Sequence, residues 1–320
     1  IGWQVSLDEI GMAGLRAAEK DAKCIAARDV SCPQCAGALK LQAPDETKRV
    51  ACPHCSSLLE CDHGNLQYLE TLKNKVDPLI EIGAEGTLFD VKYIVIGFMQ
   101  RSVTFDRKYF RTEYLLYNAD VGFRWLVHSD EHWSFSEPLS PADVHDYKTS
   151  TAWDGRTFKL FQRAIARVEY VLGEFYWKVV VGEEVTSRDL ICPPYAMSIE
   201  RSMAMASAEQ QLSGKRMNLG EVNVSLGKYV KHEVIEEAFG LKGELPRGWI
   251  VAPNQPFPCD RGIYTWWLMF GLAMGLIYLG AAGLSDSADP WVLVYGLGFL
   301  SVIPIGALMV NHSFDVKRWS

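Results

Sequence analysis

Two long apolar runs near the C-terminus restrict the fold of this chain more than any other feature. They span Ile263–Leu284 and Trp291–Val310, with the short stretch Ser285–Pro290 between them, and neither run contains a charged side chain. A helix that crosses a bilayer needs roughly 20 apolar residues at ~1.5 Å each. We therefore expect a transmembrane helical hairpin over residues 263–310 that contacts the lipid bilayer, with a water-soluble body upstream.

Residues at the ends of these runs indicate an orientation. Arg261, Lys317 and Arg318 flank the outer ends of the hairpin, whereas the loop carries Asp286 and Asp289 and no cation. Lys and Arg are enriched on the cytoplasmic side of membrane proteins, so we expect both termini and the body to be cytoplasmic. Interfacial aromatic residues mark the ends of the helices, at Tyr264, Trp266, Trp267, Trp291 and Trp319.

Small residues in the hairpin predict close helix packing. Gly271 and Gly275 form a small-xxx-small face, which lets helices approach one another. The expected partner is the other helix of the hairpin, and a second subunit, giving a homo-oligomer, is the alternative. A net charge of −7 without a basic block disfavours nucleic acid as a partner, since such binding needs a cationic surface.

Four of the eight cysteines form two Cys-x2-Cys pairs. Sixteen residues separate Cys35 from Cys52, a spacing typical of a zinc ribbon. The two-residue gap lets both thiolates of a pair face one tetrahedral ion at ~2.3 Å, and the second pair completes the ligand set. We predict one structural Zn²⁺ per chain, bound by Cys32, Cys35, Cys52 and Cys55.

Alternatives to this zinc site remain open from the sequence. The same ligands suit a rubredoxin-like iron site, and two disulfides would suit a body outside the cell. Cys24, Cys61 and His63 lie nearby and could replace a ligand, although bystander roles are favoured. Four thiolates leave no coordination position for a substrate, so the metal is expected to stabilise the small ribbon rather than to catalyse.

The region between the ribbon and the membrane is expected to be mainly β. Short runs rich in β-branched and aromatic residues recur over Gly86–Leu139 and Thr157–Leu190, with turn residues between them, a pattern typical of a barrel or sandwich of antiparallel strands. Phe175–Val181 is expected to be one of these strands. Helices are expected after the capping box at Ser6–Glu9 and over His232–Phe239, a helix or turn over Leu66–Leu72, and a helix or long turn over Ser198–Leu212.

The sequence therefore divides into seven parts. In chain order they are a helical segment (1–30), the zinc ribbon (31–62), a connector (63–85), the β-rich body (86–239), a Pro/Gly linker (240–262), two transmembrane helices (263–310) and a cytoplasmic tail (311–320). The stretches 86–139 and 157–239 are candidate related halves of the body. The chain starts at Ile1 rather than Met, which leaves open whether residues precede it.

Several motifs of the body occur together in a particular order. They are Glu113-Tyr114-Leu115-Leu116, Trp125-Leu126, His132-Trp133, Gly173-Glu174-Phe175-Tyr176-Trp177, Pro193-Pro194, Ser225-Leu226-Gly227-Lys228-Tyr229 and Ala238-Phe239. In this order they resemble the bacterial family called domain of unknown function 4178, over about residues 86–258. The resemblance implies a β-rich cytoplasmic domain, sometimes with a zinc ribbon and transmembrane helices. It also implies bacterial relatives encoded beside membrane-stress proteins of the phage-shock protein A type, small membrane proteins and aminopropyltransferase-like enzymes, and it implies no activity.

No motif in the sequence indicates catalysis. His128, Asp130, Glu131 and His132 could form a metal or acid–base site, but a polar hairpin turn is the favoured interpretation. Glu174 lies among aromatic residues that could raise its pKa, although a nearby cation or solvent is its expected partner. A phosphate-binding glycine loop, a nucleophile elbow and a His-Glu-x-x-His motif are all absent from the sequence.

These observations favour a non-enzymatic scaffold or adaptor. It would be anchored in the bacterial cytoplasmic membrane and would present its β-rich body and zinc ribbon to protein partners, as part of a membrane-stress-associated complex. One alternative is a subunit of an oligomeric transport or channel assembly. The other is an enzyme that acts on a lipid or a small molecule.

Overall fold

The computed structural model describes residues 28–62, 65–146, 149–202, 222–241, 243, 245–260, 262–284 and 289–319. The helix expected after Ser6 lies outside these ranges. So do Cys24, His63, Arg261 and the larger part of the helix or turn expected over Ser198–Leu212.

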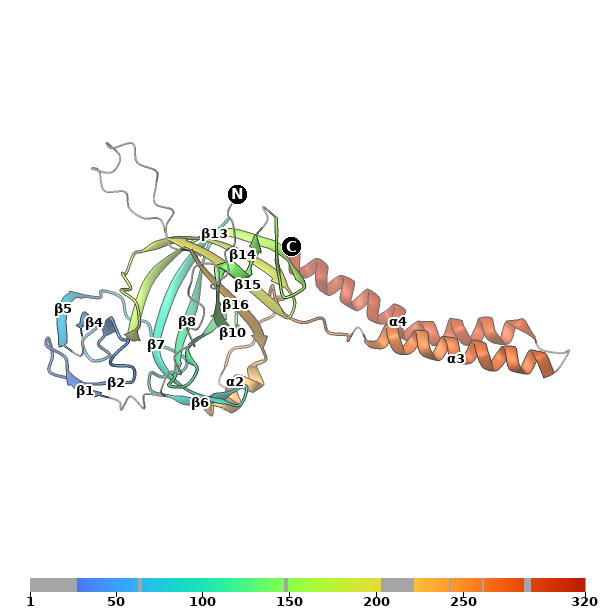
Figure 1. The fold of residues 1–320 in the computed structure, drawn as a ribbon, viewed down its shortest axis with the longest axis horizontal. Coiled ribbons are helices and arrows are strands. Elements are labelled where there is room, and N and C mark those ends of the chain that lie inside the picture. Colours follow the sequence, from blue (N-terminus) through green and yellow to red (C-terminus); the bar gives the residue numbers. More distant parts are fainter. Residues whose placement is uncertain are drawn as a thin grey trace, which may run out of the picture.

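Eight antiparallel strands close into a barrel (Figure 1). The barrel joins two four-stranded meanders, β7–β10 and β13–β16; β10 pairs with β16, and β13 pairs back to β7. The prediction of a mainly β body with two sets of strands is confirmed. The strands are β7 (Val91–Thr104), β8 (Lys108–Asn118), β9 (Gly122–Ser129), β10 (His132–Leu139), β13 (Arg156–Phe175), β14 (Glu184–Cys192), β15 (Tyr195–Ser202) and β16 (Val222–Val230).

The main hydrophobic core lies against the outside of the barrel wall. Tyr114 and Trp133 are fully buried on the outward face, because the helix α2 (His232–Phe239), the short strand β6 (Glu85–Leu88) and the segment 72–84 cover them. The backbone N–H of Leu79 in that segment donates to the Tyr114 hydroxyl at 3.0 Å. The expected helix His232–Phe239 is confirmed.

A second outer cluster lies under a small flap. The flap consists of the 3-10 turn η1 (Pro141–Asp143) and the strands β11 (His145–Asp146) and β12 (Ser150–Trp153). Val144 and Trp153 pack there against Phe158, Leu190 and Met197. Both faces of the wall therefore carry side chains that are shielded from bulk water, and the inward face is the more polar one.

The ribbon is attached to the barrel sheet rather than being a separate unit. It consists of β1 (Arg28–Ser31), β2 (Ala38–Leu41), β3 (Arg49–Ala51), β4 (Ser57–Asp62) and β5 (Asn65–Thr71). Strand β3 pairs with the end of β13 through Ala51 and Gly173. The helix or turn expected over Leu66–Leu72 is wrong, since this segment is strand β5; it pairs along the open edge of β4, a tertiary partner that local propensity does not reveal.

Other strand boundaries also differ from expectation. Strand β13 is one strand of 20 residues, because its two halves pair with different neighbours, β14 and β7. The strand expected over Phe175–Val181 is wrong: β13 ends at Phe175, and Tyr176 turns away to stack on Phe123 at 4.4 Å between ring centroids. Residues Ser198–Ser202 belong to strand β15 rather than to a helix, because both edges of that strand are paired.

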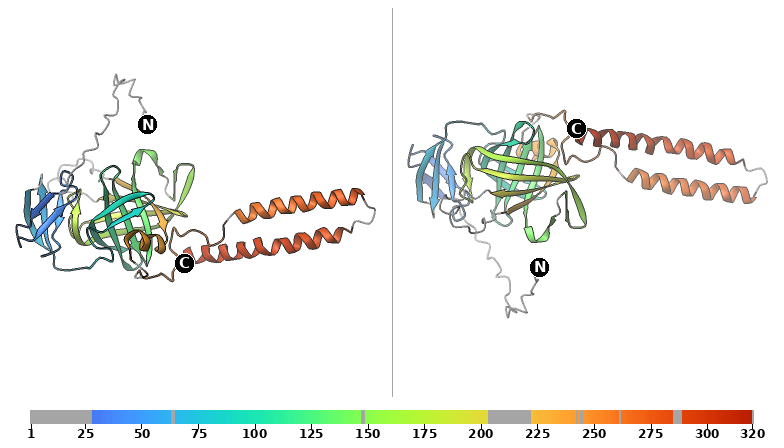
Figure 2. Two further views of the ribbon diagram at one scale, coloured as in Figure 1. Left: turned by 90° about the horizontal axis from the view of Figure 1, so that it is seen from below. Right: turned by 90° about the horizontal axis from the view of Figure 1, so that it is seen from above.

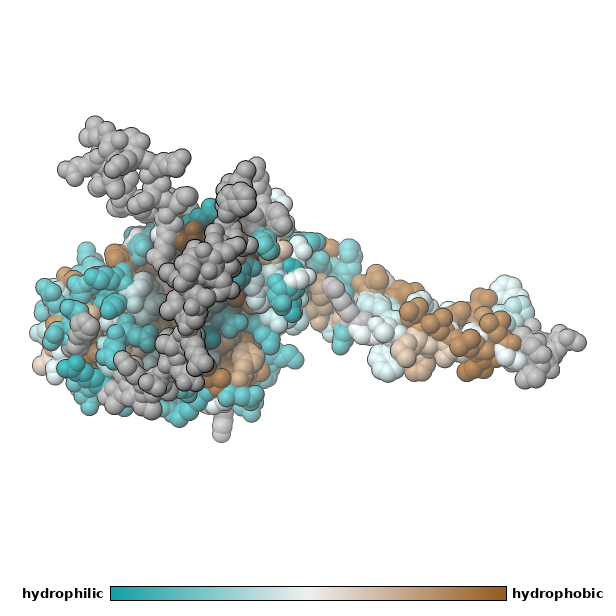
Figure 3. Space-filling view, viewed as in Figure 1, coloured by the Kyte–Doolittle hydropathy of each residue, from teal (hydrophilic) through white to brown (hydrophobic). Residues whose placement is uncertain are grey.

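The C-terminal hairpin projects away from the barrel (Figures 1 and 2). Helices α3 (Gly262–Leu284) and α4 (Pro290–Trp319) are both long and apolar enough to cross a membrane. Their outer surfaces are strongly hydrophobic (Figure 3). Gly271 lies against Leu297 of the opposite helix, and Gly296 lies against Met274. Gly275 has no such neighbour, so only the Gly271 half of the predicted small-xxx-small face packs within the hairpin.

Helix α4 extends beyond the predicted end of the second transmembrane run. Residues 311–319, predicted as a tail, are its last turns, and Arg318 is only 4% exposed. The linker is packed against the barrel, since Ala252 and Asn254 are each 5% exposed. Polar side chains of α4 and of the barrel bind the linker backbone in this region.

Candidate functional site

Two loops of the ribbon have the same backbone geometry. In the first, the Cys32 N–H donates to the Gly37 carbonyl at 2.9 Å, and the Ala36 N–H donates to the Cys32 carbonyl at 2.9 Å. In the second, Cys52 donates to Ser57 at 2.9 Å, and Ser56 donates to Cys52 at 3.0 Å. Ala36 and Ser56 both adopt a left-handed conformation, with φ of 58° and 56°. The repeated loop turns both thiols of each pair toward the same side.

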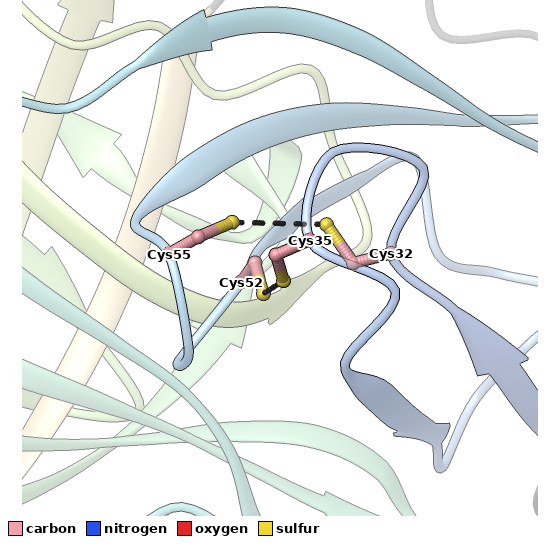
Figure 4. A group of neighbouring side chains, drawn as sticks. All are labelled: Cys32, Cys35, Cys52 and Cys55. Carbon is pink, nitrogen blue, oxygen red and sulfur yellow. Dashed lines mark hydrogen bonds between the residues drawn. The ribbon is translucent and has the colours of Figure 1, made fainter.

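The four predicted ligands converge on one point (Figure 4). Their sulfur atoms all lie within 4.8 Å of one another, and the Cys32–Cys55 and Cys35–Cys52 sulfur pairs are both 3.8 Å apart. A tetrahedral ion with bonds of ~2.3 Å separates its sulfur ligands by about 3.8 Å, whereas a disulfide needs ~2.05 Å. The arrangement therefore fits a metal ion and contains no disulfide.

The surroundings of the four thiols resemble a structural site. Cys32 and Cys52 are buried against Leu41, Val50 and Leu59, whereas Cys35 is exposed. Cys61 is buried in the same apolar cluster but outside the group of converging sulfurs, so it does not replace a ligand. Within the described ranges, this is the one group of three or more side chains that could hold a metal ion.

Glu174 connects the ribbon to the barrel. Its carboxylate accepts hydrogen bonds from the Gln42 N–H at 2.7 Å, the Ala43 N–H at 3.3 Å and the Thr47 hydroxyl at 2.9 Å. The expectation of a cation or solvent as partner is wrong, since Glu174 is 4% exposed. Burial raises its pKa, and the three hydrogen bonds oppose this rise. The carboxylate thus binds the loop between β2 and β3.

The residues around His128 form a polar turn, as favoured by the sequence. Asp130 and Glu131 connect β9 to β10 with φ of 47° and 63°. His132 is buried, with its ring nitrogens 3.1 Å from the Tyr229 hydroxyl and 2.7 Å from the Ile250 carbonyl. His128 stacks on Trp133 at 4.4 Å, and burial, followed by repulsion from His232 and His132, lowers its pKa to about 4. Both imidazoles therefore have packing or hydrogen-bond partners within the fold.

The sequence did not indicate a buried ion network inside the barrel. Glu200 of β15 accepts from Arg101 of β7 at 2.8 and 3.1 Å, and from Arg111 of β8 at 3.0 Å. Glu113 accepts from Arg111 at 2.7 Å. Because β15 is not a neighbour of β7 or β8, these ion pairs cross the lumen. The signal in the sequence was the presence of Arg111 and Glu113, two residues apart, next to the apolar run Tyr114–Tyr117 of the same strand.

Electrostatics hold this network in its charged form. Burial opposes the charge on Arg101 and Arg111, but the carboxylates of Glu113 and Glu200 keep the pKa of both guanidinium groups above its usual value. Burial likewise opposes ionisation of Glu200, yet the two arginines hold its pKa below the ordinary value. Arg101 and Arg111 are therefore cations and Glu200 is an anion at neutral pH.

Comparison with known proteins finds one family model, and it matches the part of the chain that forms the barrel. The family model described as Domain of unknown function (DUF4178) matches residues 81–232. This range runs from just before β6 to the first residue of α2 and contains all eight barrel strands. No curated protein and no solved structure matches the chain. The match supports the resemblance for the barrel and assigns no activity.

Proposed function

We propose that this protein is a membrane-anchored, non-enzymatic scaffold that presents its barrel and ribbon to protein partners at the cytoplasmic face of a bacterial membrane. The observation that carries the proposal is the firm connection between the barrel and the two apolar helices. The side chain of Asn311 in α4 binds both backbone groups of Cys259, accepting from its N–H at 3.1 Å and donating to its carbonyl at 3.0 Å.

Further contacts extend this connection to the barrel wall. Arg318 donates to the Gln255 carbonyl at 2.6 Å and stacks on Phe257 at 4.6 Å. The Asn254 side chain donates to the Ser134 hydroxyl at 3.0 Å, and Ile250 binds His132. A barrel held in this way keeps a fixed orientation relative to the hairpin, which supports a role in positioning a surface rather than in diffusing to a target.

The ribbon offers a surface for a protein partner. It lies at the end of the barrel opposite the hairpin (Figure 1). Strand β5 ends the path of paired strands, and its exposed residues include Tyr68 at 41% and Leu69 at 39%. An open strand edge with exposed aromatic and aliphatic side chains is suited to pairing with a strand of another protein. We propose that partners bind along this edge.

In this proposal the four cysteines hold one structural Zn²⁺. Four thiolates would fill the coordination shell of the ion, so Cys32, Cys35, Cys52 and Cys55 act only to fix the two loops. The metal would stabilise a ribbon whose own apolar cluster is small, with a binding energy on the order of 10 kcal/mol. Thiolate ligands persist in a reducing compartment, which supports a cytoplasmic body.

Crosslinking mass spectrometry in native membranes tests the scaffold proposal. With the full chain, crosslinks to a partner should cluster on residues 65–71, and Leu69→Pro should remove them because proline disrupts a paired edge. Val180→Glu, at an exposed apolar position of the barrel, is the matched control and should keep them. Recovery of a monomer with no protein crosslinks in any variant would refute the proposal.

A further inference from the structure

The barrel encloses a cavity of about 1750 Å³. Barrels of eight strands are either filled by their own side chains or hold one small ligand. Here the largest buried rings, such as Tyr114, Trp133 and Phe158, pack outside the wall. Several inward positions are occupied by small residues, among them Ser134, Ser198 and Ser225, which leaves space in the lumen.

An arginine pair lies in the middle of this lumen. Arg101 is 7% exposed, and its Nε is buried without a hydrogen-bond partner. Arg111 is adjacent to it across the β7–β8 pairing. Planar guanidinium groups bind carboxylate or phosphate oxygens in a bidentate manner. Glu200 reaches the pair from the opposite wall, and among these four groups it is the most exposed, with 19% of its side chain accessible.

Apolar and aromatic side chains line part of the cavity. Trp125 and Trp177 meet edge to face at 5.5 Å, and Met99 and Val127, which both lie opposite Glu113 in the sheet, also line the cavity. Asn254 of the linker and Arg318 of α4 contribute to the same lining. The cavity therefore combines apolar side chains, a pair of cations and residues at the base of the hairpin.

We infer that the lumen binds a single-chain anionic amphiphile, whose carboxylate or phosphate group pairs with Arg101 and Arg111 in place of Glu200. The acyl chain would lie along Met99, Val127 and Trp125. Exchanging one anion for another leaves neither arginine unpaired. The displaced carboxylate of Glu200, which is the most accessible of the four groups, must then be solvated by water in the open lumen, because a buried charge without a partner is costly. A bilayer crossed by α3 and α4 would supply such molecules close to the barrel.

Binding by the full-length protein in detergent micelles tests this inference. Displacement of a fluorescent long-chain fatty acid would be measured with three competitors: oleate, oleoyl lysophosphatidic acid and the uncharged oleyl alcohol. Oleate and the lysophosphatidic acid should compete at least 10-fold better than the alcohol. The stronger of the two acids identifies a carboxylate or a phosphate as the preferred head group.

Two variants separate the lumen from non-specific binding. Glu200→Gln removes the competing anion and should tighten the binding of oleate about 10-fold, a gain that misfolding does not mimic. Arg111→Met should weaken oleate at least 10-fold and leave the alcohol unchanged. Arg156→Met, at an exposed arginine paired with Asp154 at 2.6 Å, is the matched control and should bind like the parent protein.

Three results would overturn the inference. They are equal competition by oleyl alcohol and oleate, an unchanged or weaker affinity in Glu200→Gln, and the absence of bound fatty acid in the parent protein. The inference depends on the lumen alone. An absence of protein crosslinks at β5 in the parent protein would therefore refute the scaffold proposal without affecting this one.

Discussion

At the scale of single residues, burial rather than sequence neighbourhood determines what a polar side chain does. Glu174 is surrounded in sequence by aromatic residues, yet its three hydrogen-bond donors come from residues 42–47. His128 and His132 are close in sequence, but one stacks on a tryptophan and the other binds the linker. Each of these groups has a structural partner that local patterns do not show.

Removing the Glu174 carboxylate should weaken the attachment of the ribbon. Glu174→Ala leaves the backbone N–H groups of Gln42 and Ala43 without their acceptor, at a cost of about 3 kcal/mol, whereas the Thr47 hydroxyl can still donate to the Ala43 carbonyl at 2.8 Å. Glu174→Gln retains one acceptor oxygen and removes the charge of a buried carboxyl group whose pKa is raised. The loss of stability in this variant should therefore stay within about 1 kcal/mol. Hydrogen exchange at Gln42 and Ala43 is the measurement; equal protection in parent and alanine variant would contradict the assignment.

Stability should fall in mild acid because of His128. Its pKa is about 4 in the folded protein against an ordinary 6.5, so between these values the unfolded chain binds a proton that the folded protein does not. Stability is therefore lost as the pH falls from about 6.5 to 4, by at most about 3 kcal/mol. Urea unfolding at several pH values measures the slope of the unfolding free energy against pH.

His128→Phe keeps the stacking on Trp133 and should flatten the slope. A smaller slope should remain from His132, whose pKa burial also lowers. His145→Asn, at an exposed position, is the control and should leave the slope of the parent. An unchanged slope in His128→Phe would assign the acid sensitivity to other groups.

At the scale of elements, the ribbon and the barrel depend on different interactions. The ribbon has a small apolar cluster and four converging thiols, whereas the barrel has a closed sheet and a large outer core. They are joined by the pairing of β3 with β13, by the Glu174 hydrogen bonds and by the ion pair between Lys178 and Glu60 at 2.7 Å. Loss of the thiol cluster should therefore unfold the ribbon and leave the closed sheet of the barrel folded.

Cys52→Ser should release the proposed zinc and unfold the ribbon alone. We expect about one zinc per chain in the parent protein and a loss of nearly all of it in the variant, because three thiolates bind far more weakly than four. Elemental analysis measures the metal, and hydrogen exchange should rise over residues 28–62 but not in β7–β10. Cys61→Ser is the matched control and should retain the metal. Equal metal contents in parent and Cys52→Ser would refute the site.

At the scale of the whole molecule, the hairpin and the barrel are connected through side chains of α4. Arg318 was interpreted from the sequence as an orientation signal, but it is buried against Phe257 and bound to Gln255. Packing against the linker therefore explains the position of Arg318, in addition to any effect of its charge on the orientation of the hairpin in the membrane. Both outer ends of the hairpin lie on the barrel side (Figure 2).

Asn311→Leu should loosen this connection. It removes both hydrogen bonds to Cys259 and should cost about 2 kcal/mol of local stability. Limited proteolysis of the linker 245–260 should accelerate at least 10-fold. His312→Leu, at the next position and exposed, should digest like the parent protein. A linker equally resistant in both variants would show that Arg318 alone maintains the junction.

A cysteine in the loop between α3 and α4 tests the proposed topology. In a Cys259→Ser background, Ser287→Cys should react with an impermeant thiol reagent in intact cells, since the loop is expected outside while the barrel is cytoplasmic. The native Cys192 of the barrel should react only after lysis. The opposite pattern of labelling would invert the orientation.

The sequence by itself determined the features that depend on local chemistry. Two uncharged apolar runs are long enough to cross a membrane wherever they occur, and a two-residue gap between cysteines forms a ligand loop from its own backbone. Strand content was also predictable over most of the body, because β-branched and aromatic residues favour a pleated, half-buried surface. The four ligand cysteines and both C-terminal helices follow from these rules.

Only the tertiary structure decided which face of each strand is inside. Alternation separates Arg111 and Glu113 from Tyr114 and Leu116, but closure of the sheet by β13 and β7 determines that the charged side faces the lumen. The same closure gives β15 its two partners and places Glu174 against the ribbon. Pairing between distant strands depends on the whole chain, so neither the outer core nor the polar cavity was visible in any local pattern.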